Sequence, residues 1–162
     1  MKKIYYILVP LIIVLVSSAI YFVLSKKENI QSPPPQTTFT EPTGSDEKMT
    51  LSTVNGDIKI NNLYKNPVAT LYHNGVLFQQ TPDFEMSFYP DDQGFIISLL
   101  NPDLQKARNE AEKAFLETLG ISKEQACLLK ISLGVTADIS EKAAGQNYGL
   151  SFCPNGRPLP AQ

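Results

Sequence analysis

The longest apolar run in the sequence lies at its N-terminus. Residues 4–24 are 21 consecutive positions without a charged side chain, with two lysines before the run and two after it. A helix of this length, at about 1.5 Å per residue, is roughly 30 Å long and matches the hydrocarbon core of a bilayer. We therefore predict a transmembrane helix over residues 4–24 in contact with the lipid bilayer, with residues 1–3 as a short cytoplasmic head.

A cleaved signal peptide is the alternative interpretation of this run, because Ser17-Ser18-Ala19 offers small residues for cleavage. The apolar part of a signal peptide spans only about 7–15 residues, and this run is longer. We therefore favour an uncleaved signal-anchor that exports the residues after it. The expected location is the cell membrane, with a single pass, the N-terminus in the cytoplasm and the C-terminal domain outside it.

Residues 25–48 change abruptly to Pro, Thr, Ser, Gln and acidic side chains, with Pro33-Pro34-Pro35 near their centre. Such a segment buries too little apolar surface to offset the entropy that it would lose on ordering. We interpret it as a tether between the membrane and an exported domain. Residues 154–162 are interpreted as a disordered tail.

Globular patterning extends over residues 49–153. Two segments, 51–60 and 69–79, consist of short alternating runs around Asn55-Gly56 and Asn74-Gly75. Asn-Gly supplies the two positive-φ residues that a tight hairpin turn favours. Both segments are therefore predicted to be β-hairpins.

Four further segments have the pattern of strands. Residues 83–89 alternate apolar and polar, residues 95–100 are nearly all apolar, and residues 128–135 and 148–153 are strand-like. Alternation is typical of a half-buried strand, whereas a continuous apolar run is typical of a strand buried on both faces. Residues 95–100 are therefore expected at the centre of the sheet.

Residues 102–119 show the clearest helical pattern. Asn101 is in position to cap the helix, Pro102 suits its first turn, and Gly120 ends it. Ser122 with Gln125 indicates a capping box for one further short turn. The apolar stripe of the helix consists of Leu104, Ala107, Ala111, Phe115 and Leu119, and the side chains expected on its opposite, solvent-facing side are Lys106, Arg108, Glu110, Glu112, Lys113 and Glu117.

Together these patterns predict an α+β fold of two layers: an antiparallel-rich sheet with one long helix packed on it. Strand 95–100, helix 102–119 and strand 128–135 are expected to form a βαβ crossover, which would make the two strands parallel.

The charge balance narrows the class of partner. Beyond Lys2 and Lys3 the chain has 12 basic and 16 acidic residues, a net charge of −4. Nucleic acids and anionic lipid surfaces are bound by concentrated positive charge, so we expect no nucleic-acid partner.

The sequence carries few residues for catalysis or metal binding. His73 is the only histidine, and there is no Cys-x-x-Cys, so we expect neither a metal site nor a cofactor. His73 beside a predicted turn is interpreted as an exposed hairpin residue. Asp91 and Asp92 lie in a predicted turn after Pro90, where aspartate serves backbone geometry. A hydrolase that uses Asp91, Asp92 and His73 would require all three side chains to converge on one cleft.

Cys127 and Cys153 are the only cysteines, and each lies at the end of a predicted strand. Export would place them in an oxidising compartment, which favours a disulfide between them. The alternatives that stay open are two buried free thiols and, less favoured, a thiol nucleophile activated by His73.

Much of the exported domain resembles small membrane-anchored bacterial proteins of unassigned function. The likeness covers residues 84–153 and rests on Phe95-Ile96-Ile97-Ser98-Leu99, Ala107-Arg108, Ala111-Glu112, Leu116, Leu119-Gly120-Ile121, Ala126-Cys127, Ala144-Gly145 and Tyr148-Gly149-Leu150-Ser151-Phe152-Cys153. The resemblance implies a location in the cell envelope and no particular reaction.

An anchor, a tether and a small domain without an evident active site favour a binding module of the envelope with a protein partner, not an enzyme. A pilin-like or assembly subunit is the alternative. Type IV pilins have a glycine before the cleavage point and a glutamate five residues into the mature helix, and residues 1–24 contain neither glycine nor glutamate.

Overall fold

A computed structural model describes residues 46–160. The predicted transmembrane helix and nearly all of the tether lie outside these residues. None of the helices that the structure describes is long and apolar enough to span a bilayer.

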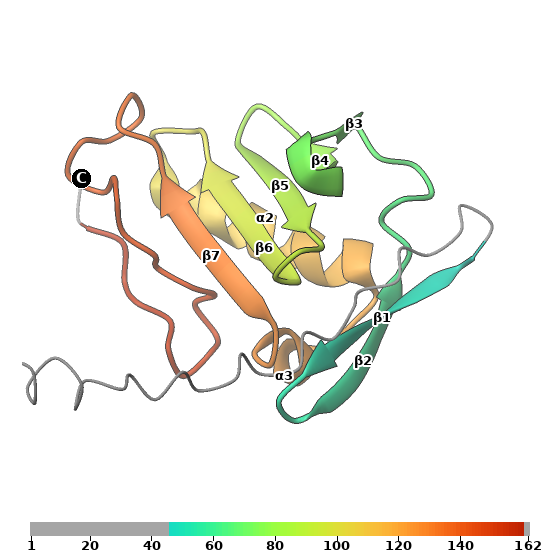
Figure 1. Cartoon of the computed structure of the whole chain (residues 1–162). Helices are drawn as coiled ribbons and strands as arrows, with labels where there is room; N and C mark the ends of the chain where they lie inside the picture. The colour runs from blue at the N-terminus through green and yellow to red at the C-terminus, as the bar shows by residue number, and fades with distance from the viewer. Residues whose placement is uncertain (1–45, 161–162) are drawn as a thin grey trace, which may run out of the picture. The chain divides into compact units, whose positions relative to one another are not determined.

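The described residues form an α+β fold with two sheets and one long helix (Figure 1). A five-stranded mixed sheet has the order β3-β4-β5-β6-β7, and a separate two-stranded sheet is the hairpin β1-β2. The elements are β1 (Lys48–Thr53), β2 (Gly56–Asn61), β3 (Ala69–Thr70), the 3-10 turn η1 (Tyr72–Asn74), β4 (Val76–Gln80), β5 (Phe84–Tyr89), β6 (Gly94–Leu99), α2 (Leu104–Leu119), α3 (Lys123–Ala126) and β7 (Lys130–Val135).

The predicted βαβ crossover is confirmed. Strands β6 and β7 pair in parallel, with Phe95 opposite Ile131 and Leu99 opposite Val135, and α2 connects them along the chain. All other pairs in the five-stranded sheet are antiparallel. The sheet is therefore antiparallel-rich, as its strand patterns predict.

The core lies between this sheet and α2. The five apolar stripe residues of the helix are all buried, as predicted. Phe115 packs edge-on against Phe95 of β6, with ring centroids 5.2 Å apart. In Figure 1 the helix lies behind the sheet, so the reader faces the side that α2 does not cover.

That second face corrects the prediction that residues 95–100 are buried on both sides. Strand β6 is central, but Ile96 on the face away from α2 is 42% exposed. The domain has one helix of more than four residues among those described, and it covers one face of the sheet. Within residues 46–160, no helix covers the other face.

Both hairpins form, but their turns differ from the expected Asn-Gly geometry. In the first, only Gly56 of the pair has positive φ, at 114°. In the second, the positive-φ residues are His73 and Asn74, at 56° and 54°, whereas Gly75 has φ −65°. Gly75 is needed for space: an added Cβ would lie 2.9 Å from the ring of Tyr89.

Helix α2 begins two residues later than predicted, and its cap is Asp103 in place of Asn101. The Asp103 side chain accepts a hydrogen bond from the backbone N–H of Lys106, at 3.1 Å. The side chain of Asn101 instead accepts from the N–H of Asp103 and donates to Asp83. The predicted stop at Gly120 and the capping box of Ser122 and Gln125 are both confirmed.

The prediction that Arg108 and Glu112 face solvent is wrong. Their exposed fractions are 2% and 6%, and Arg108 Nε donates to Glu112 Oε1 at 2.9 Å. The C-terminal segment, residues 147–160, covers them. Burial of the pair is possible because this segment supplies the hydrogen-bond partners that water would otherwise provide.

The same segment corrects two further predictions. Residues 148–153 form irregular turns, not a strand, and residues 154–160 of the expected disordered tail are placed against the domain. The N–H of Tyr148 donates to the carbonyl of Leu133, and the Asn147 side chain accepts from the N–H of Leu133. The C-terminal segment thus covers the outer edge of β7, which protects an edge strand from pairing with other chains.

Candidate functional site

A hollow lies on the sheet face away from α2. Its volume is about 470 Å³, which is within the range of ligand-binding cavities. The turn before β4, the turn between β5 and β6, and the first residues of β7 surround it. His73, Asp91 and Asp92 all line this hollow, together with Tyr89 and Lys130. The three polar residues singled out in the sequence therefore do converge.

His73 owes its position to the 3-10 turn before β4. Its backbone is left-handed, which costs a non-glycine residue energy and is often seen at functional sites. Its Nδ1 lies 3.4 Å from Asp91 Oδ2, and its ring meets the ring of Tyr72 edge-on at 4.0 Å between centroids. The His73 and Asp91 side chains are 61% and 70% exposed, so their mutual attraction is weakened by water.

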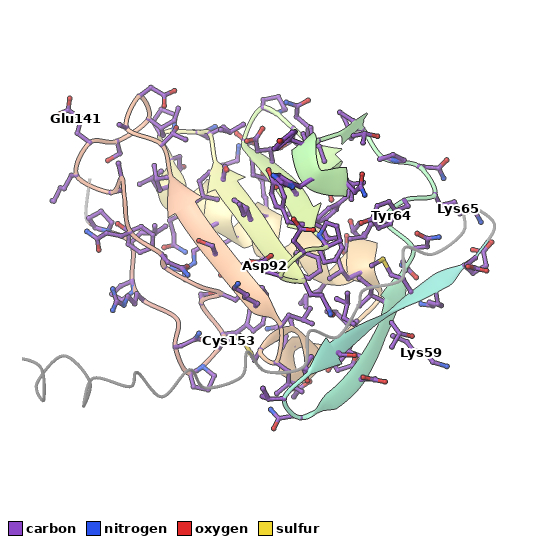
Figure 2. All side chains as sticks on the ribbon, viewed as in Figure 1. Lys59, Tyr64, Lys65, Asp92, Glu141 and Cys153 are labelled. Atoms are coloured by element: carbon purple, nitrogen blue, oxygen red, sulfur yellow. A yellow bond between two sulfur atoms is a disulfide. The ribbon has the colours of Figure 1, made fainter. Side chains whose placement is uncertain are left out.

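Asp92 is held more firmly than Asp91. Its Oδ1 accepts a hydrogen bond from the N–H of Gly94 at 3.1 Å, and its Oδ2 accepts one from Lys130 Nζ. A Cβ on residue 94 would lie 2.7 Å from Asp92 Oδ1, so a side chain at this position would displace the Asp92 carboxylate. Asp92 is therefore paired with Lys130 across the hollow and is not one of two free carboxylates. Figure 2 labels Asp92 on the connection between β5 and β6.

Two smaller hollows adjoin the first along the same face. One, of about 270 Å³, shares Asp92 and Lys130 with it and continues to Val54 and Leu128. The other, of about 370 Å³, shares Ile96, Ser132 and Asn147 with it and continues along β6 and β7 to Thr136. We refer to these three adjoining hollows as the trough.

The trough borders most of the exposed apolar surface of the described residues. Val54, Ile96 and Leu128 line it, and Tyr72 is 82% exposed against His73 at its rim. Val68 is the one other large apolar side chain that is exposed in residues 46–160. Apolar side chains gathered along a concave surface indicate an interaction site more strongly than the same side chains scattered singly.

Cys127 and Cys153 form a disulfide, with their Cα atoms 5.4 Å apart. It joins the end of α3 to the C-terminal segment (Figure 2 labels Cys153). With both cysteines oxidised, neither is a free thiol, and the thiol-nucleophile hypothesis does not apply to this state.

The Arg108–Glu112 pair is a buried ion pair that the sequence pattern did not predict. Arg108 also donates to three backbone carbonyls of the C-terminal segment, those of Arg157, Gly149 and Tyr148, at 2.7, 2.8 and 3.3 Å. Glu112 accepts from the backbone N–H and the hydroxyl of Ser151. The i,i+4 spacing beside the apolar stripe was a signal, but the partners lie about 40 residues further along the chain.

Metal binding has no support in the described part of the chain. Residues 46–160 contain no group of three His, Cys, Asp or Glu side chains placed to hold a metal ion.

Comparison with known proteins gives no relative from which a function could be transferred. No protein-family model, curated protein or solved structure matches the chain.

Proposed function

We propose that this protein is a single-pass membrane-anchored protein whose extracytoplasmic α+β domain binds a partner protein of the cell envelope through the trough. The observation that carries this proposal is the position of the trough on the sheet face that α2 leaves uncovered, bordered by exposed apolar side chains. A surface of this kind releases water from apolar groups when a partner covers it.

The charges in the trough favour binding over catalysis. General acid–base chemistry uses groups whose protonation is tuned by burial or by a charged neighbour. Asp92 is already paired with Lys130, and the side chains of His73 and Asp91 are more than half exposed. These groups are suited to selecting a partner by charge.

Crosslinked pull-down of the full-length chain, followed by mass spectrometry, tests the proposal. Ile96→Glu places a charge in the trough, and Val68→Glu places one on exposed surface that does not line it. We expect a recurrent partner with the wild type and with Val68→Glu that is lost with Ile96→Glu. A set of captured proteins that is the same for all three chains would refute the trough as the binding site.

The location outside the cytoplasm has its own test. Protease added to spheroplasts should degrade the domain after Lys48. Full protection of the domain until the membrane is disrupted would place it in the cytoplasm and refute this part of the proposal.

A small hydrolase is the second candidate, and the contact between His73 and Asp91 favours it. A carboxylate on Nδ1 orients an imidazole and leaves Nε2 for a substrate or a water molecule. Ester and peptide substrates should then be hydrolysed by the wild type and by Asp138→Asn, which changes an exposed carboxylate elsewhere, but not by His73→Gln. Equal turnover by the wild type and His73→Gln would reject this candidate.

A further inference from the structure

We infer that the occupant of the trough is an extended peptide segment of the partner, with a basic side chain beside Asp91 and apolar side chains before and after it. This inference rests on the proposed binding function and adds the chemical class of the ligand.

The shape of the trough fits an extended chain. It follows β6 and β7, strands of six residues each, and at about 3.3 Å per residue these strands are roughly 20 Å long. The hollow beyond Lys130 continues it to Val54 at the tip of the β1-β2 hairpin. A segment of six or more residues in extended conformation can therefore lie along the sheet face.

Both apolar and polar side chains line this path. Ile96 lies near its middle, and Val54 and Leu128 lie at the hairpin end. Ser98 and Ser132 line the trough as well, and no hydrogen bond of their hydroxyl groups occurs within residues 46–160. The apolar side chains of a peptide can pack against Ile96, Val54 and Leu128. Its backbone N–H and C=O groups can form hydrogen bonds with the two serine hydroxyls.

The charges in the hollow that His73 and Asp91 line favour a basic side chain. Lys130 and Asp92 neutralise each other, and within residues 46–160 the one ionisable partner beside the carboxylate of Asp91 is the His73 imidazole. Residues 46–160 have 10 Lys and Arg against 14 Asp and Glu, so the wider field also attracts a cation. Tyr89 lines the same hollow and the ring of Tyr72 lies against His73 at its rim, and aromatic rings attract ammonium and guanidinium groups.

Fluorescence anisotropy with three labelled peptides tests this inference on the full-length chain in mild detergent. The probes are Ser-Thr-Val-Lys-Val-Thr-Ser, with blocked ends, and its analogues with Glu or norleucine in place of Lys. We expect the Lys peptide to bind about fivefold more tightly than the norleucine peptide and the Glu peptide to bind most weakly, since an exposed ion pair contributes up to about that factor. The preference for Lys should diminish between 50 mM and 500 mM salt.

Asp91→Asn is the informative variant, because its side chain is exposed and its loss should not disturb folding. It should remove the preference for the Lys peptide and leave the affinity for the norleucine peptide unchanged. Asp138→Asn is the matched control, since it removes an exposed carboxylate outside the trough and should retain the preference. Thermal unfolding of each variant verifies that the fold is intact.

The outcomes separate this inference from the proposed function. Equal affinity for the three peptides, or a Lys preference that survives Asp91→Asn, would overturn the inference. A glycan fragment or an anionic lipid vesicle that binds in place of the peptides, with loss of binding in Ile96→Glu, would also overturn it while the trough remained a binding site. Absence of any partner sensitive to Ile96→Glu would overturn the proposed function itself.

Discussion

Replacing Arg108 by methionine should destabilise the domain far more than removing any solvent-exposed charge on α2. The methionine keeps much of the side-chain volume but removes every hydrogen bond that Arg108 donates. Glu112 would then be a buried carboxylate without its cation, and the carbonyls of Gly149 and Arg157 would lose their donor.

The expected loss is about 3–5 kcal/mol in the free energy of unfolding, the range for breaking one side of a buried ion pair. This is a large share of the total stability of roughly 5–15 kcal/mol that a small domain has. Lys113→Met is the matched control on the same helix: its side chain is 77% exposed in an i,i+4 pair with Glu117, and the expected loss is below about 0.5 kcal/mol.

Urea unfolding followed by circular dichroism, with the disulfide intact, measures these values. For a slope of about 1–3 kcal/mol per M, the Arg108→Met midpoint should fall by roughly 1–5 M. Combining Arg108→Met with Glu112→Met should be less destabilising than the sum of the two single changes, because the second change removes the charge that the first leaves unpaired. A loss below about 1 kcal/mol for Arg108→Met, or strictly additive effects, would refute the reasoning.

Three further changes test other parts of the structure. Gly156→Ala should destabilise by roughly 1–3 kcal/mol in the same urea assay, because the added Cβ would lie 2.2 Å from a backbone carbonyl oxygen and the C-terminal segment would have to shift; an unchanged midpoint would contradict this packing. A free-thiol count on the denatured, unreduced chain should find no thiol, and Cys127→Ser with Cys153→Ser should lower stability by about 3 kcal/mol; two titratable thiols would contradict the disulfide. The hydrogen bond from Asn101 holds the pKa of Asp83 below its usual value, and the charge of Lys106 makes a smaller contribution. This interaction therefore stabilises the fold at pH above the usual pKa, and the stabilisation is lost as the pH falls through the lowered pKa. Asn101→Ala should raise the pKa of Asp83, which NMR of its carboxyl carbon can follow. A pKa that stays low in this variant would assign the shift to another group.

Much of the fold follows from short-range patterns in the sequence. Hairpins, the stripe of α2, its stop at Gly120 and the capping box at Ser122 depend on residues only a few positions apart. Propensity and steric constraints act over that range, which is why these elements are predictable from the chain alone. The crossover of β6, α2 and β7 follows from the order of the elements.

The candidate site depends on contacts between distant parts of the chain. His73, Asp91 and Lys130 come from three separate segments, and only the pairing of β4 with β5 and of β6 with β7 brings them to one hollow. The sequence alone nominates His73 and Asp91 as residue types that can do chemistry, but it contains no measure of their separation.

The sequence by itself therefore predicted the α+β class, most of its helices and strands, and the pairing of the two cysteines. Tertiary structure alone decided that Arg108 and Glu112 are buried, that residues 148–153 form no strand, and that α2 covers only one face of the sheet. The physical reason is that burial depends on what covers a residue. Here the cover is the C-terminal segment, which lies about 40 residues away along the chain and is brought onto α2 by the hydrogen bonds of Arg108 and by the disulfide at Cys153.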